Sequence, residues 1–165
     1  MPEDITDSVC NDEWRARCLA GIVNGMTNSK LLPWRVEYTC RRRDDHQTFA
    51  MDDVGLLVVD DVVRGRVMSD GVLSIDGSPC GVLDLDGQAR FKYDTMTVTT
   101  DGTLFYRSED DDPLVSYEDD GRMNVLGLHD PEDGLVFHGP REARRWATFA
   151  LLGLYIRSDV TFRMF

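Results

Sequence analysis

The middle of the chain consists of short segments in which apolar and polar residues alternate. Residues 35–40 place every second side chain on one apolar face, which is the period of a half-buried β-strand. Residues 46–51 are the predicted partner strand, across a turn at 41–45. Residues 54–59 are apolar throughout and therefore predict a central strand that is covered on both faces.

Asp-Gly dipeptides divide the following part of the chain and predict tight turns. Glycine accepts positive φ freely and aspartate tolerates it, so the pair suits hairpins. The segments between them are rich in β-branched and aromatic residues, which favour strands. Because the spacing of the dipeptides is irregular, we expect an antiparallel meander and not a repeat protein. The dipeptides are Asp70-Gly71, Asp76-Gly77, Asp86-Gly87, Asp101-Gly102, Asp120-Gly121 and Asp133-Gly134.

Helical spacing marks the N-terminal part of the chain. Asp7 or Ser8 can cap a helix that runs to about Asn24, where Gly25 supplies a left-handed stop. Apolar residues four apart give this helix one apolar stripe. The stripe consists of Cys10, Trp14, Cys18 and Ile22, widened by Val9, Leu19 and Val23.

A second helix is predicted over residues 141–153, near the C-terminus. Pro140 fits its first position, because the missing N–H would be unpaired there. Its predicted inward face consists of Trp146, Phe149, Ala150 and Leu154. Residues 160–165 alternate again and predict a final strand.

These elements predict an α+β fold in a single domain of residues 1–165. We expect a mostly antiparallel β meander of seven to ten strands. The sheet is expected to be curled or to form a partial barrel, packed by an N-terminal and a C-terminal helix.

Composition and charge narrow the classes of function. The chain has 165 residues, 30 acids against 18 bases and a formal charge of −12. We expect no direct nucleic-acid binding and no membrane surface as a partner, because both require a basic footprint. The acidic N-terminus and the lack of a long apolar run predict an intracellular protein, in the cytoplasm or nucleus of a host if viral. The four cysteines are then expected to be reduced and buried.

No motif in the chain indicates an enzyme, a metal or a cofactor. There is no P-loop, no dinucleotide fingerprint and no closely spaced Cys/His set for zinc. Residues 84–95 begin like a calcium-binding loop, but Ala89 and Thr95 occupy positions that need Gly and Glu. We expect no catalytic residues, no metal site and no cofactor.

The densest run of acids is the candidate partner-binding surface. Seven carboxylates within twelve residues repel one another unless a cation or a basic partner lies nearby. A solvated loop is the alternative interpretation. The acids are Glu109, Asp110, Asp111, Asp112, Glu118, Asp119 and Asp120.

One basic triplet opposes the net charge. Arg41, Arg42 and Arg43 occupy a predicted hairpin loop and could bind phosphate or an acidic peptide. The adjacent Asp44 and Asp45 favour a locally neutralised turn as the alternative.

The order of the elements resembles the SUKH superfamily of toxin-immunity proteins and viral antagonists. The resemblance is carried by Leu32-Pro33-Trp34 and by the helix with Trp146 and Phe149. It covers a small part of the chain and transfers no functional residue. It implies an immunity or antagonist domain.

Together, these features predict a non-enzymatic, acidic interaction protein. We expect an inhibitor, antagonist or adaptor, of viral or phage origin as one reading, that docks a basic surface of a protein partner. A small enzyme or ligand-binding β-barrel is one alternative. A virion assembly subunit is another, in which strand edges such as residues 160–165 pair between copies and give a homo-oligomer.

Overall fold

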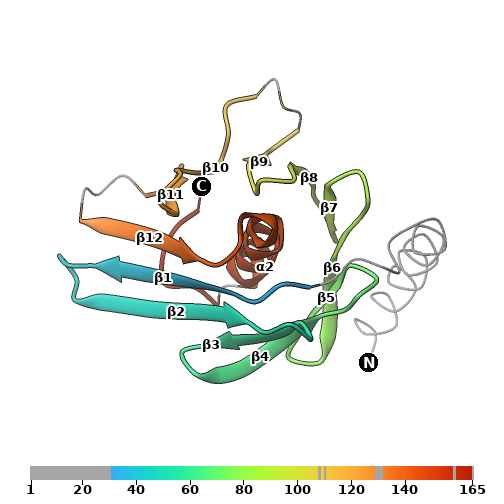
Figure 1. The fold of residues 1–165 in the computed structure, drawn as a ribbon, viewed down its shortest axis with the longest axis horizontal. Helices are drawn as coiled ribbons and strands as arrows, with labels where there is room; N and C mark the ends of the chain where they lie inside the picture. Colours follow the sequence, from blue (N-terminus) through green and yellow to red (C-terminus); the bar gives the residue numbers. More distant parts are fainter. Residues whose placement is uncertain (1–30, 108, 110, 129–131, 158, 165) are drawn as a thin grey trace.

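The computed structural model describes residues 31–107, 109, 111–128, 132–157 and 159–164. The helix predicted over residues 7–24 lies outside these described residues. Within them, a closed antiparallel β-barrel surrounds one α-helix (Figure 1). Among the described residues, no helix is both long and apolar enough to cross a membrane.

Twelve strands of the described residues follow one another around the barrel in sequence order. The barrel closes where β1 pairs with β12, with Val36 opposite Phe137. The strands are β1 (Trp34–Cys40), β2 (Asp45–Met51), β3 (Leu56–Val59), β4 (Val62–Val67), β5 (Val72–Ile75), β6 (Ser78–Leu83), β7 (Gln88–Phe91), β8 (Thr95–Val98), β9 (Leu104–Phe105), β10 (Val115–Tyr117), β11 (Arg122–Val125) and β12 (Asp133–His138).

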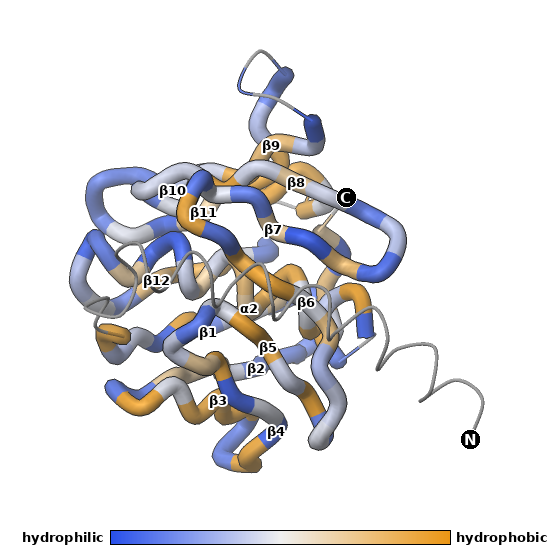
Figure 2. Tube along the Cα trace, turned by 90° about the vertical axis from the view of Figure 1, so that its right-hand side faces the viewer, coloured by the Kyte–Doolittle hydropathy of each residue, from blue (hydrophilic) through white to orange (hydrophobic). Residues whose placement is uncertain are grey.

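Alternation along the strands decides which side chains face the interior. In β1, Val36, Tyr38 and Cys40 are buried, as the sequence predicted. The alternation of hydrophobic and hydrophilic positions is visible along the tube in Figure 2. The expectation of a doubly covered strand at residues 54–59 is wrong: in β3 only Leu57 and Val59 are fully buried. Leu56 and Val58, which alternate with them, are only half-buried, because successive side chains of a barrel strand point alternately to the inside and the outside.

The C-terminal helix lies inside the barrel and not against its outside. It begins as a 3-10 turn, η2 (Arg141–Ala143), and continues as α2 (Arg144–Ile156). Figure 1 looks along α2 within the ring of strands. Every α2 residue from Trp146 to Leu154 is buried, so the prediction of one inward face is too narrow. A helix that is apolar on all sides requires a covering on all sides. The sheet was predicted to be curled or to form a partial barrel. In the structure it is a closed barrel, and α2 fills its interior.

Aromatic packing and a few buried hydrogen bonds hold α2 in place. Phe149 packs against Phe91 of the wall, with ring centroids 5.7 Å apart. The Thr148 hydroxyl donates to the carbonyl of Gly102 at 2.7 Å and lies 2.9 Å from the Tyr117 hydroxyl. Burial raises the pKa of Tyr117, so its hydroxyl stays protonated within this network.

The predicted final strand at residues 160–165 is not present in the described part of this segment. Phe162 and Met164 are buried, but the described part of the tail pairs with no strand. The ring of Phe162 lies 4.8 Å from that of Tyr38. Gln47 fixes the tail by donating to the carbonyl of Asp159 and accepting from the amide of Thr161. Since the barrel is already closed, the tail contributes side chains to the core instead of a strand.

Candidate functional site

Five hairpin turns of one geometry stand at the end of the barrel where α2 begins. In an up-and-down barrel, alternate hairpins lie at the same end, because consecutive strands run in opposite directions. In each of these turns the glycine amide donates to the carbonyl three residues before it, and the glycine has positive φ. We call these turns the turn rim. It consists of residues 52–55, 68–71, 84–87, 99–102 and 118–121.

The turn rim carries a high density of negative charge. Its twenty residues include nine carboxylates and neither lysine nor arginine. Asp53, Asp86 and Asp119 are exposed. The nine are Asp52, Asp53, Asp70, Asp84, Asp86, Asp101, Glu118, Asp119 and Asp120.

Several of these carboxylates stabilise the turns themselves. Asp52 accepts the amides of Val54 and Leu56, at 3.1 and 2.8 Å. Asp84 uses one oxygen in the same way and the other for an ion pair with Arg90 at 3.1 Å. Turn chemistry thus explains why acids recur there, and it leaves their charge in place.

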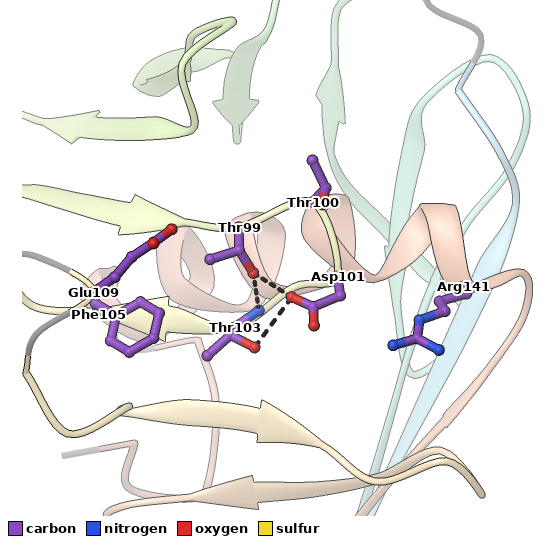
Figure 3. A pocket seen from close by; sticks show the side chains of 7 residues that line it. All are labelled: Thr99, Thr100, Asp101, Thr103, Phe105, Glu109 and Arg141. Carbon is purple, nitrogen blue, oxygen red and sulfur yellow. Dashed lines mark hydrogen bonds between the residues drawn. The ribbon is translucent and has the colours of Figure 1, made fainter.

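Two adjoining hollows flank the β8–β9 turn of the rim. The larger, of about 630 Å³, is lined by Asp101, Phe105, Glu109 and Arg141, among others (Figure 3). The smaller, of about 210 Å³, shares Thr99, Thr100 and Glu109 with it and includes Arg145. Both are open to solvent.

The hollows are lined by both acidic and basic side chains, and the pKa values of Asp101 and Arg145 are both lowered. The hydroxyl of Thr99 donates to Asp101 and lowers the pKa of that carboxyl, although burial opposes the shift. Thr103 donates to the same oxygen at 3.2 Å, as Figure 3 shows. Partial burial lowers the pKa of Arg145, and the nearby Asp84 counteracts this effect. The larger hollow therefore has an ionised carboxylate in its lining, and the smaller one has a partly desolvated guanidinium.

The predicted acidic surface is divided by β10. Glu118, Asp119 and Asp120 belong to the turn rim, where Arg122 lies 3.6 Å from Glu118. Glu109, Asp111 and Asp112 are exposed in the β9–β10 loop, which precedes the other end of this strand. Glu109 nevertheless lines both hollows beside the rim, whereas Asp110 lies outside the described residues.

The basic triplet lies in the β1–β2 turn, at the opposite end from the rim. Arg41 and Arg42 are exposed. Arg43 is held by the protein: it donates to the Tyr38 hydroxyl at 2.6 Å and to the Cys40 sulfur at 3.4 Å. Its guanidinium also lies 3.6 Å from Asp133. Arg43 therefore has an ion-pair partner, Asp133, that lies far from it in the sequence.

Other candidate groups have local structural partners. Cys40 is buried and Cys80 is half-buried; burial raises the pKa of Cys80 to about 12. His138 lies 3.6 Å from Glu37 in a largely exposed pair. Across the described ranges, no group of three or more Cys, His, Asp or Glu side chains could hold a metal ion.

The turn rim itself was not predicted, although the sequence contains a signal for it. Gly55, Gly71, Gly87 and Gly102 are spaced sixteen, sixteen and fifteen residues apart. Gly55 follows Val54 and is therefore not part of an Asp-Gly dipeptide, whereas the dipeptide Asp76-Gly77 lies at the opposite end of the barrel. Asp133-Gly134 was predicted as a turn, but it lies within β12.

The fold defined by the described residues is a closed antiparallel barrel around a helix, with an acidic rim at one end. Comparisons with protein-family models, with curated proteins and with solved structures found no match to this chain.

Proposed function

We propose that the protein is a non-enzymatic interaction protein that docks a basic surface of a partner protein against the turn rim. The supporting observation is the concentration of nine carboxylates, without lysine or arginine, in five turns at one end of the barrel. An inhibitor, antagonist or adaptor role fits this proposal.

The electrostatics of such a rim favour fast and salt-sensitive association. The carboxylates on these fixed turns produce a negative electrostatic potential, which attracts a basic surface. At physiological ionic strength the field of exposed charges decays over about 8 Å, so the partner must approach the rim closely. Hydrogen bonds to Asp52, Asp84 and Asp101 fix the turns before binding, which limits the entropy lost on association.

The filled interior favours surface binding over the ligand-barrel alternative. A ligand inside the barrel would have to displace α2, whose residues Trp146–Leu154 are buried. The assembly alternative relied on a strand at residues 160–165, which the described part of the tail does not form. The described barrel is also closed, so its β1 and β12 edges pair with each other.

The experiment compares two variants that have the same change in charge. The rim variant combines Asp53→Asn, Asp86→Asn and Asp119→Asn, which are exposed side chains. The control variant combines Asp44→Asn, Asp61→Asn and Asp94→Asn, which are exposed in turns at the other end. Both variants are tested for binding to an oligo-arginine peptide and for capture of proteins from a lysate, at low and at high salt.

We expect the rim variant alone to lose affinity for the basic peptide and to lose salt dependence. The same proteins should be captured by the wild type and by the control variant, and fewer by the rim variant. Equal losses in both variants would indicate attraction by net charge alone and would overturn the proposal. A third variant, with Glu109, Asp111 and Asp112 neutralised, measures the contribution of the β9–β10 loop.

A further inference from the structure

A groove of about 330 Å³ crosses the surface of β3, β4 and β5, away from the hollows beside the β8–β9 turn. Leu56, Val63 and Gly65 contribute apolar surface to it, and Arg66 and Asp76 contribute charged surface. A Cβ built on Gly65 would lie 2.2 Å from the carbonyl oxygen of Ser74, so glycine is required for this close approach of β4 to β5.

Three apolar side chains next to β3 and at the start of β4 are exposed, and one of them, Val63, lines the groove. Val62 and Val63, at the start of β4, are 60% and 57% exposed. Val54, in the turn before β3, is 58% exposed. The orange segments of β3 and β4 lie together in the lower part of Figure 2. Apolar surface concentrated in one place indicates a contact with another segment or molecule.

The chain enters the described structure close to the same place. Leu31 is buried, and its Cδ1 lies 2.9 Å from the position of a Cβ built on Gly55. The next residue, Leu56, lines the groove. Seven residue steps separate Leu31 from Asn24, a reach of at most about 25 Å. This length allows the end of the helix predicted over residues 7–24 to reach the groove.

We propose that the groove is the docking site of residues 7–24 of the same chain. The predicted apolar stripe of Trp14, Cys18 and Ile22 needs an apolar surface, and Leu56 and Val63 provide one. Both surfaces carry charges of both signs: the groove has Arg66 and Asp76, and acids up to residue 13 are followed by Arg15 and Arg17. These acids are Glu3, Asp4, Asp7, Asp12 and Glu13. The contact is independent of the function proposed for the turn rim.

Acrylamide quenching of tryptophan fluorescence tests the contact in the full chain. The chain has three tryptophans, and Trp34 and Trp146 are only 3% and 7% exposed. Quenching therefore reports mainly on Trp14. We expect weak quenching in the wild type and a severalfold increase in Val63→Glu. Adding Trp14→Phe to Val63→Glu should remove the increase.

Tyr93→Glu is the matched control, because Tyr93 is 85% exposed in the β7–β8 turn. It should leave quenching unchanged. Far-ultraviolet circular dichroism establishes that each variant is folded. If Trp14 of the wild type were already as accessible as in Val63→Glu, the proposal would be wrong.

Disulfide trapping gives a second, independent measurement. Val63→Cys places a thiol at the groove, and Cys18 supplies its partner within the predicted stripe. The described native thiols contribute little, since Cys40 is buried and burial raises the pKa of Cys80 to about 12. Mild oxidation should form an intramolecular Cys18 disulfide in Val63→Cys and not in Tyr93→Cys. Equal yields in both variants, or a disulfide-linked dimer, would overturn the assignment; the dimer would identify a second copy as the occupant.

Discussion

The position of α2 inside the barrel predicts different costs for two glycine substitutions. Gly77 and Gly102 both have positive φ, +81° and +89°, and both lie in hairpin turns. A Cβ built on Gly77 meets nothing within 4 Å. A Cβ built on Gly102 lies 2.7 Å from Tyr117 Cε1 and 2.8 Å from the carbonyl carbon of Arg144 at the start of α2.

The difference between the two substitutions isolates the contact with the helix. Gly77→Ala should lower the free energy of unfolding by about 1–2 kcal/mol, the cost of a left-handed backbone for a residue with a Cβ. Gly102→Ala has the same backbone cost and adds about 1–3 kcal/mol for overpacking against α2 and Tyr117. A chain of this length loses roughly 2–4 °C in Tm per kcal/mol.

Urea unfolding followed by circular dichroism measures both variants. The midpoint should fall further for Gly102→Ala, while the slope with denaturant remains that of the wild type. Equal midpoints for the two alanine variants would mean that the β8–β9 turn does not pack on the helix. That result would refute the placement of α2 within the barrel.

Three further predictions concern the Thr148 hydroxyl, the Arg43 guanidinium and the Cys80 thiol. Thr148→Val removes the hydroxyl that bridges Gly102 and Tyr117, so the free energy of unfolding should fall by about 1–3 kcal/mol, whereas Thr95→Val at an exposed position should change little. Arg43→Ala should lower the urea midpoint because it removes the contacts to Tyr38, Cys40 and Asp133, and Arg41→Ala should not; equal midpoints would contradict a structural role for Arg43. Cys80 should resist alkylation in the folded protein at pH values near its ordinary pKa of 9.0, because burial raises that pKa to about 12. The burial of the protonated Cys80 thiol contributes its full stabilisation below pH 9.0, and this contribution is lost as the pH rises toward 12. Cys80→Ala should therefore reduce the loss of stability at alkaline pH. An unchanged dependence of stability on pH would contradict this assignment.

Local patterns predicted most of the elements in the described part of the chain. Alternation identified β1 and β2 within one residue of their observed bounds, and Pro140 identified the residue before η2. Alternation at residues 160–165 predicted a final strand, whereas Phe162 and Met164 are buried in the core without belonging to a strand. A strand assignment needs a partner with free backbone groups, and the closed barrel leaves the tail none at the β1 and β12 edges.

The candidate site was predictable only in its parts. The acids of the β10–β11 turn were recognised as a cluster, whereas those of the turns at residues 52–55 and 84–87 were interpreted only as local turn residues. These turns are far apart in the sequence, and only the folded barrel brings them to the same end. Arg43 illustrates the same limit, because its partner Asp133 is ninety positions away and reaches it only through the pairing of β1 with β12.

The sequence by itself determined the period-two strands, the glycines at positive φ and the apolar character of residues 146–154. These are local properties, set by backbone sterics and by the polarity of neighbouring side chains. Only the tertiary structure decided that the sheet closes, that α2 lies inside it and that five turns form one acidic rim. Closure depends on the pairing of the first and last strands, β1 and β12, and on a helix of suitable width to fill the interior. No local pattern in the chain encodes that long-range match.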